Sequence, residues 1–261
     1  MFSFHVASSV RRLLLLVICL ALGGAAVSAE RPCSVRVVDP RCEYLADPLG
    51  IDVRQPRLSW RLESVDAAAR GQKQTVYQVQ VAGTYALLEQ GKPDLWDSGM
   101  VASDRSAHVV YAGKPLVSGT PYFWRVRVKD HSGAFSAWSP LARWTMGLLE
   151  TADWSAKWIG CDQVFKRQGG WPPPDNKVPD PWLRKAFELK ARPERAVIYV
   201  ASVGYHEVYV NGQRIGDSVL APAVANHRKW ARYVAYEIGD QLKEGSSGFC
   251  VLFMVGYATS S

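Results

Sequence analysis

The sequence is poor in cysteine, and its cysteines form no metal-binding pattern. Five cysteines occur in 261 residues, with no Cys-x-x-Cys pair and no Cys/His cluster. A structural zinc site needs such closely spaced ligands, so the sequence argues against one. Cys33 and Cys42 are near enough in sequence to close a small loop, which makes them candidates for a disulfide in an oxidising compartment. A pairing of Cys161 with Cys250 stays open.

The chain also lacks the common sequence signatures of an active site. It has no Gly-x-Ser-x-Gly elbow and no phosphate-binding Gly-x-x-x-x-Gly-Lys-Ser/Thr loop, and its five histidines lie far apart. These absences argue against a serine-type triad and against a P-loop. Glycoside hydrolysis would need two carboxylates facing each other across a sugar, and sequence spacing places no two acids in that way. We therefore assign no catalytic residue and no cofactor other than a candidate calcium ion.

The apolar run near the N-terminus is too short to span a membrane. It covers residues 13–22, whereas a transmembrane helix needs about 20 apolar residues. Two arginines precede the run, and a Val-Ser-Ala triplet suited to signal peptidase ends at Ala29. We predict a signal peptide of residues 1–29, cleaved after Ala29, and hence a secreted or periplasmic protein without a membrane partner. An uncleaved anchor is the alternative.

A concentrated positive charge is missing too. The formal net charge is +7, but the basic residues are scattered, and Arg125, Arg127 and Lys129 alternate along one predicted strand. Nucleic-acid-binding proteins gather such residues in a stripe or on a helix. We therefore expect no nucleic-acid partner.

A helical period is absent apart from one turn at residues 85–90, whereas a period of two recurs. Apolar and polar residues alternate over residues 57–63, 77–81 and 122–128. Strands with one wet face are typical of antiparallel sheets, so we predict an all-β protein of two β-sandwich domains.

The entry into the third of these strands is informative. The segment Leu-Val-Ser-Gly-Thr-Pro-Tyr ends at Tyr122, just after a turn, where the phenol can bond back to the upstream backbone. This tyrosine corner is typical of immunoglobulin-like sandwiches. The segment resembles a fibronectin type III module, and we predict such a domain over residues 30–148. Another antiparallel hairpin is the alternative.

A second domain is predicted over residues 149–261. Residues 169–181 contain five prolines and are expected to form a loop, after which strands resume at Trp182. Asn211 and Gly212 lie between two apolar strands and supply the two positive-φ residues of a type I′ turn. We predict a β-hairpin there.

Exported sandwiches often bind sugars with exposed aromatic faces, and loop oxygens bind hydroxyl groups or calcium. Asp175 and Asn176 are the candidate calcium ligands, and ordinary turn chemistry is the alternative for this pair. Asn211 is a further candidate, for which the turn itself is the alternative. The candidate sugar-binding residues are Trp171, Asp175, Asn176, Tyr205, His206 and Trp230.

Seven segments in order resemble the N-terminal part of bacterial α-L-rhamnosidases of the large, inverting, multi-domain kind. The first four resemble the opening fibronectin-like domain of that family, the fifth its domain junction, and the last two its accessory jelly-roll domain, with the match continuing over residues 233–245. The segments are RLSW at 57–60, YQVQV at 77–81, WDSG at 96–99, GTPYFWRVRV at 119–128, DWSAKWIG at 153–160, WLRKAFEL at 182–189 and VASVGYHEVYVNGQRIGDSVLAP at 200–222.

The resemblance implies an accessory role. In the family, two carboxylates in a helical barrel that follows these β-domains perform the hydrolysis. Because no such helical segment follows here, we expect a fragment that is inactive alone, with an incomplete second sandwich. In some relatives the jelly roll binds terminal rhamnose with calcium, which implies a rhamnose-containing glycoside as the partner. The alternatives are a free-standing carbohydrate-binding module and a structural or protein-interaction spacer.

Overall fold

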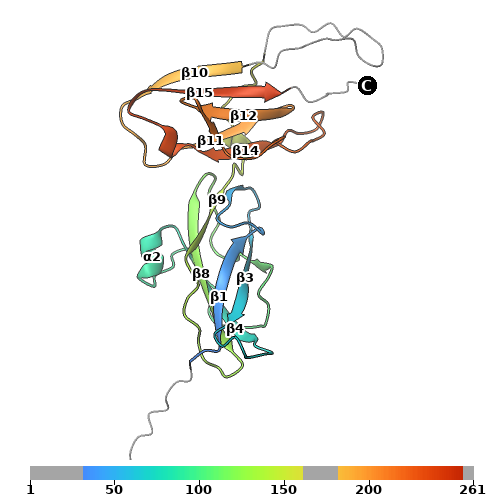
Figure 1. The fold of residues 1–261 in the computed structure, drawn as a ribbon, viewed down its shortest axis with the longest axis vertical. Coiled ribbons are helices and arrows are strands. Elements are labelled where there is room, and N and C mark those ends of the chain that lie inside the picture. Colours follow the sequence, from blue (N-terminus) through green and yellow to red (C-terminus); the bar gives the residue numbers. More distant parts are fainter. Residues whose placement is uncertain (1–31, 161–181, 255–261) are drawn as a thin grey trace, which may run out of the picture.

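Nearly all of the regular secondary structure that the structure describes is β-strand, which confirms the predicted all-β fold class. The structure is a computed structural model that describes residues 32–160 and 182–254. Figure 1 shows two β-sandwiches arranged end to end, the first formed by β1 to β9 and the second by β10 to β15. Within these two ranges, no helix has the length and apolar character that a membrane crossing requires.

The first sandwich has two sheets and one short helix, α2 (Tyr85–Glu89). One sheet has the order β1-β3-β7, and the other has the order β2-β9-β8-β4-β5, with β6 also pairing with β4. Only the short β2–β9 pair is parallel. The strands are β1 (Val35–Cys42), β2 (Leu49–Ile51), β3 (Arg57–Ser64), β4 (Gln74–Ala82), β5 (Trp96–Asp97), β6 (Val101–Ala102), β7 (Val109–Val110), β8 (Pro121–Asp130) and β9 (Ala142–Met146).

The core of the first sandwich follows the alternation in the sequence. Along β8, Tyr122, Trp124, Val126 and Val128 are all buried, and Trp144 from β9 packs among them. Successive strand residues point to opposite faces, so one face of β8 supplies the core.

The tyrosine corner is confirmed. The Tyr122 hydroxyl accepts a hydrogen bond of 2.8 Å from the backbone N–H of Val117. This bond fixes the turn before β8 to the buried end of the strand, as expected for an immunoglobulin-like sandwich.

The face of β4 predicted to be wet is covered instead. Gln78 and Gln80 are buried, because arginines from the neighbouring strand lie over them: Arg127 donates to Gln78 and Arg125 to Gln80. Both amides in turn donate to Asp97 at 2.8 Å. Each buried glutamine amide therefore has both a donor and an acceptor partner on a neighbouring strand. These hydrogen bonds offset the cost of removing the amides from water.

The predicted disulfide does not form, since Cys33 and Cys42 are both free thiols. Most of the chain between them is β1, an extended strand of eight residues. The ends of β1 lie opposite Ser64 and Leu58 of β3, which at about 3.3 Å per residue are roughly 20 Å apart, whereas a disulfide needs Cα atoms within about 7 Å. Proximity in sequence was therefore a poor guide here.

The second sandwich pairs a four-stranded sheet with a two-stranded one. The larger sheet has the order β10-β15-β12-β13, and the smaller one is β11-β14. Its core contains Val200, Val208, Val210, Tyr236 and Leu242. The strands are β10 (Trp182–Leu189), β11 (Val197–Ala201), β12 (Tyr205–Val210), β13 (Gln213–Ile215), β14 (Tyr233–Glu237) and β15 (Gly245–Met254).

The predicted hairpin is also confirmed. Asn211 and Gly212 connect β12 to β13 with φ values of 49° and 83°, the positive values that a type I′ turn requires. Val208 lies opposite Ile215 across the hairpin, and both side chains are buried. The turn therefore sets the register that directs these residues into the core.

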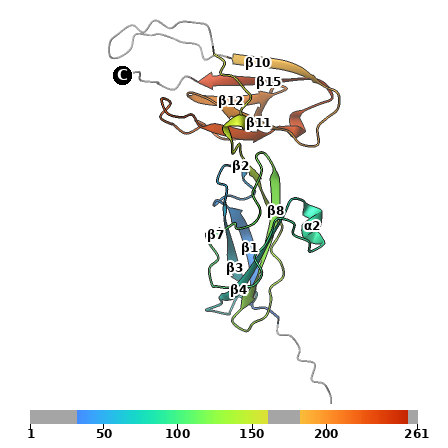
Figure 2. The same ribbon diagram turned by 180° about the vertical axis from the view of Figure 1, so that it is seen from behind.

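The two sandwiches contact each other at a joint that both views show, between the β2–β9 end of the first and the β11–β14 sheet of the second (Figures 1 and 2). The Tyr233 hydroxyl accepts a hydrogen bond of 3.0 Å from the backbone N–H of Leu148. Arg195 donates to the carbonyl of Gly119 at 3.3 Å and to the hydroxyl of Thr145 at 3.2 Å. We call these contacts the inter-sandwich joint.

Candidate functional site

An aromatic pair lies on the outer face of the four-stranded sheet. Val208 and Val210 of β12 point into the core, so the residues that alternate with them, Glu207 and Tyr209, point outward. Trp182, at the start of β10, is 61% exposed, and its ring centroid lies 5.7 Å from that of Tyr209. The sheet therefore presents two aromatic rings side by side.

Charged groups lie beside this pair. The Tyr209 hydroxyl donates to a Glu207 carboxylate oxygen at 2.8 Å, and the other oxygen of Glu207 is 3.1 Å from the Arg214 guanidinium. We call Trp182, Glu207, Tyr209 and Arg214 the outer-face platform. Apolar rings next to fixed hydrogen-bonding groups suit a ligand with one apolar face and several hydroxyl groups.

Of the sugar-binding residues predicted from the sequence, Tyr205 lies on the face of this platform, whereas Trp182 and Tyr209 were not predicted. Tyr205 begins β12 and shares the outward face with Glu207 and Tyr209. Trp230 lies in the loop between β13 and β14, is 48% exposed, and has the Arg232 guanidinium 4.8 Å from its ring centroid. The alternation of β12 could have revealed Tyr209, but no local signal links it to Trp182.

Three predicted residues cannot be compared with the structure, because Trp171, Asp175 and Asn176 lie outside the described residues. The candidate calcium ligands are among them. Within residues 32–160 and 182–254, no group of three or more His, Cys, Asp or Glu side chains could hold a metal ion. The calcium prediction therefore still rests on the sequence.

His206 is a core residue rather than a surface residue. It is 2% exposed, and its two ring nitrogens lie 2.7 Å from the Ser202 hydroxyl and 3.0 Å from the Tyr236 hydroxyl. The Ser202 hydroxyl donates to the carbonyl of Gly204, so it accepts from Nδ1–H of His206, and Nε2 accepts from Tyr236. This hydrogen-bond chain leaves His206 no surface for a ligand in this conformation.

The burial of His206 makes stability depend on pH. Desolvation lowers the pKa of His206 from 6.5 to about 4. The unfolded chain therefore binds a proton that the folded chain does not, and stability falls as the pH drops from 6.5 towards 4, by up to about 3 kcal/mol. Urea unfolding at pH 7.5 and pH 4.5 measures this loss.

The control for this prediction separates His206 from the carboxyl groups that also titrate in acid. A His206→Gln variant should be less stable at pH 7.5 but should lose less stability between the two pH values than the wild type. A matched His131→Gln change at an exposed position is the control for the loss of an imidazole side chain as such. Equal pH dependence in wild type and His206→Gln would contradict the prediction.

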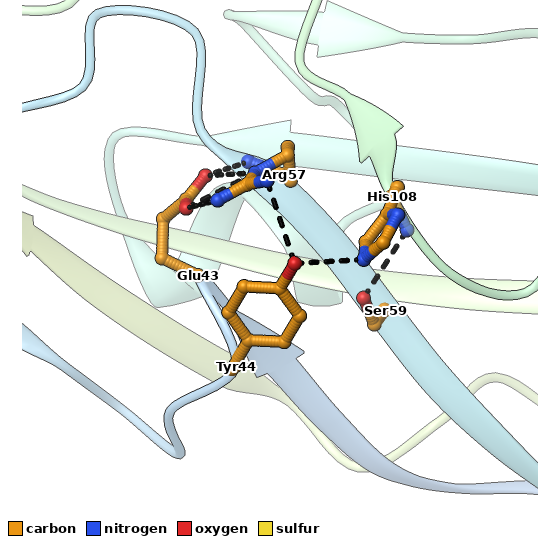
Figure 3. Close-up of polar contacts among 5 residues, drawn as sticks. All are labelled: Glu43, Tyr44, Arg57, Ser59 and His108. Atoms are coloured by element: carbon orange, nitrogen blue, oxygen red, sulfur yellow. Dashed lines mark hydrogen bonds and ion pairs between the residues drawn. The ribbon is translucent and has the colours of Figure 1, made fainter.

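The first sandwich carries a polar cluster of its own, which was not predicted from the sequence (Figure 3). Glu43 forms a bidentate ion pair with Arg57, and the hydrogen bonds from Arg57 lower the pKa of the Glu43 carboxyl. Arg57 also lies 3.4 Å from the Tyr44 hydroxyl, which is 2.9 Å from Nε2 of His108. The backbone N–H of His108 donates to Ser59 at 3.3 Å. The polar groups of the cluster are therefore hydrogen-bonded to one another.

The cluster fixes two loops to strand β3. Glu43, Tyr44 and His108 have positive φ values of 47°, 69° and 55°, which cost free energy in residues other than glycine. The mutual hydrogen bonds hold them in place.

Beside the cluster, a concavity of about 890 Å³ is lined by Asp52, Val53, Arg54, Gln55, Arg57, Val110, Tyr111, Gly113, Lys114, Pro115 and Leu116. Two of its four charged residues, Arg57 and Arg54, are paired with Glu43 and Glu150.

Comparison with known families assigns both sandwiches. Residues 37–150 match the family described as the Rha78A-like, N-terminal immunoglobulin domain. Residues 191–260 match the α-L-rhamnosidase N-terminal domain. The two matches follow each other in the same order as the two sandwiches.

Comparison with individual proteins gives the same result. An α-L-rhamnosidase of Streptomyces avermitilis is 36% identical over 230 residues, which cover 84% of this chain and 22% of that protein. One from Formosa agariphila is 34% identical over 216 residues, covering 82% and 23%. The solved structure of the α-L-rhamnosidase from Dictyoglumus thermophilum shares 30% identity with a TM-score of 0.78, covering 88% and 26%.

The chain therefore spans between 22% and 26% of the length of these three relatives. Its two sandwiches, in the order in which they occur, match N-terminal domains of α-L-rhamnosidases.

Proposed function

We propose that this chain is a non-catalytic accessory region of an exported α-L-rhamnosidase, and that its second sandwich binds terminal L-rhamnose. The observation that carries the accessory role is the ordered match of both sandwiches to N-terminal domains of that family. The outer-face platform supports the sugar-binding part, since a 6-deoxy sugar offers an apolar face to Trp182 and hydroxyl groups to Glu207 and Arg214.

The state of the described carboxyl groups supports a non-catalytic role. A general acid in glycoside hydrolysis needs a raised pKa. Every described carboxyl group with a shifted pKa has it lowered. Burial alone would raise the pKa of Asp97 and Asp130, but their hydrogen bonds outweigh it, and hydrogen bonds also lower the pKa of Glu43 and Asp153. These groups favour their ionised forms.

The inter-sandwich joint supports a scaffold role beside sugar binding. Arg195 reaches from the second sandwich to two groups of the first, and Glu237 holds it in position at 3.3 Å. Such contacts fix the direction in which the outer-face platform faces relative to the first sandwich. A sugar bound to the platform would thereby be held at a set position relative to the first sandwich.

Calorimetric titration of the chain with L-rhamnose, with and without calcium, tests the sugar-binding part. Trp182→Ala should weaken binding by about tenfold, because an aromatic contact contributes roughly 0.5 to 1.5 kcal/mol beyond its buried area. Trp158→Ala is the matched control, since Trp158 is 68% exposed and lies outside the platform. It should leave the affinity unchanged.

The possible outcomes separate the parts of the proposal. No heat in either condition would remove sugar binding and leave a spacer role. Binding that Trp182→Ala does not weaken would place the site elsewhere, and loss in Asp175→Ala together with loss of calcium dependence would assign it to the predicted calcium ligands. Export and cleavage after Ala29 are checked separately, by N-terminal sequencing of the secreted chain.

A further inference from the structure

Among the described strands, β10 is paired along one of its two edges only. It pairs along all eight of its residues with β15, and no other described strand pairs with its opposite edge. Figures 1 and 2 show β10 at the end of the second sandwich farthest from the first. An edge of this length presents a row of unpaired backbone N–H and C=O groups to any strand that can approach it.

The two faces of β10 differ in chemistry. Trp182, Arg184, Ala186 and Glu188 are exposed on the outer face, in line with Tyr209 through the pairing with β15. Leu183, Lys185, Phe187 and Leu189 alternate with them. Lys185 is exposed, the other three are half-buried, and Phe187 and Leu189 pack against the core. The edge therefore combines free charges with apolar side chains that the sandwich does not fully cover.

The charges on the outer face are complementary to themselves. Neither Arg184 nor Glu188 forms an ion pair within residues 32–160 and 182–254. In an antiparallel pair centred on Ala186, Arg184 of one copy lies opposite Glu188 of the other, and the relation occurs twice by symmetry. Leu183 then lies opposite Leu189 on the inner face, also twice.

Neighbouring registers are disfavoured. Pairing must keep outer residues opposite outer residues, so the register can shift only in steps that preserve the two faces. Centring the pair on Lys185 would place this lysine opposite itself, and centring it on Phe187 would place Arg184 opposite Lys190. Like charges directly opposite each other are destabilising. Of these three registers, the one centred on Ala186 places unlike charges opposite each other.

We propose that β10 is a self-association edge, at which a second copy of this chain adds its own β10 in antiparallel register about Ala186. The two four-stranded sheets become one continuous sheet of eight strands across a twofold axis. Main-chain hydrogen bonds supply the association, and the two Arg184–Glu188 pairs set its register. The outer faces stay open, so the outer-face platform of each copy remains accessible.

Sedimentation equilibrium of the full 261-residue chain over a range of concentrations tests the proposal. The wild type should show a monomer–dimer equilibrium with the molar mass doubling at high concentration. Arg184→Glu places two glutamates opposite each other at both symmetric positions and should raise the dissociation constant by about tenfold or more. Glu188→Arg should do the same through opposed arginines.

The double variant Arg184→Glu with Glu188→Arg restores unlike pairs in the same register and should regain the wild-type association. This recovery distinguishes pairing across the dyad from any effect of either charge alone. Circular dichroism of each variant verifies folding, which these exposed positions should not disturb. A monomeric wild type, single variants that associate as well as the wild type, or a double variant no better than the single ones would overturn the proposal.

Discussion

Replacing Trp144 by alanine is expected to lower the free energy of unfolding by about 4 kcal/mol, the usual range for removing a large buried aromatic side chain. Trp144 is fully buried at the centre of the first sandwich. Its ring centroid lies 5.7 Å from that of Tyr122 and 6.1 Å from that of Tyr111, and its indole N–H donates to the sulfur of Met146 at 3.2 Å. The substitution leaves a cavity that rigid neighbouring rings cannot fill.

Chemical denaturation followed by far-ultraviolet circular dichroism measures this loss. Trp158→Ala removes a tryptophan of the same size that is 68% exposed and should cost less than about 0.5 kcal/mol. Tyr122, Trp144 and the bond to Val117 form one packed unit, so the loss should also weaken the tyrosine corner. Equal losses in the two tryptophan variants would contradict the core described above.

Replacing Gly147 by alanine is expected to disrupt the inter-sandwich joint. A Cβ atom at this position would overlap the Tyr233 hydroxyl and lie 3.1 Å from the carbonyl oxygen of Gly50. The hydroxyl cannot move away cheaply, because it accepts the bond from Leu148 and its ring packs edge-on against Trp154 with centroids 5.4 Å apart. We expect a cost of about 1 to 3 kcal/mol, typical of overpacking.

The measurement is limited proteolysis together with thermal unfolding. Gly147→Ala should expose the connection between the sandwiches to cleavage and separate their unfolding transitions. Gly160→Ala is the matched control, since its added Cβ would meet nothing within 4 Å. Combining Gly147→Ala with Tyr233→Phe removes the clashing oxygen and should cost less than the sum of the two single changes. Strict additivity would indicate that Tyr233 does not transmit the effect.

Local features of the fold could be predicted from the sequence because their causes are local. The Asn211-Gly212 turn needs only two residues that tolerate positive φ, and the tyrosine corner joins Tyr122 to a residue five positions earlier. The alternation of β8 likewise reports its own burial. These features hold in almost any surroundings that keep the strands paired.

Features that depend on pairing between distant segments could not be predicted. Gln78 and Gln80 look solvent-exposed until the partners from β8 and β5 are known. Cys33 and Cys42 look close until the strand between them is known to be extended. Glu43 pairs with Arg57, and the Tyr44 hydroxyl bonds to His108, because the fold brings separate segments of the chain together.

In the candidate site, too, local features could be predicted and features that depend on strand pairing could not. Tyr205 and Trp230 were selected by residue type, and both lie on or near the surface of the second sandwich. His206 was selected beside them, but the alternation of β12 directs it inward, where it bonds to Ser202 and Tyr236. The pairing of Trp182 with Tyr209 depends on β15 lying between β10 and β12, an order that spacing along the chain does not contain.

One nuclear magnetic resonance experiment tests the central claim, that the chain binds rhamnose without cleaving rhamnosides. Methyl α-L-rhamnopyranoside is incubated with the chain, and saturation transfer and the anomeric signals are recorded from the same sample. We expect saturation transfer to the rhamnose ring, weaker for Trp182→Ala, with the glycoside intact throughout. Release of free rhamnose, or no saturation transfer with and without calcium, would contradict it.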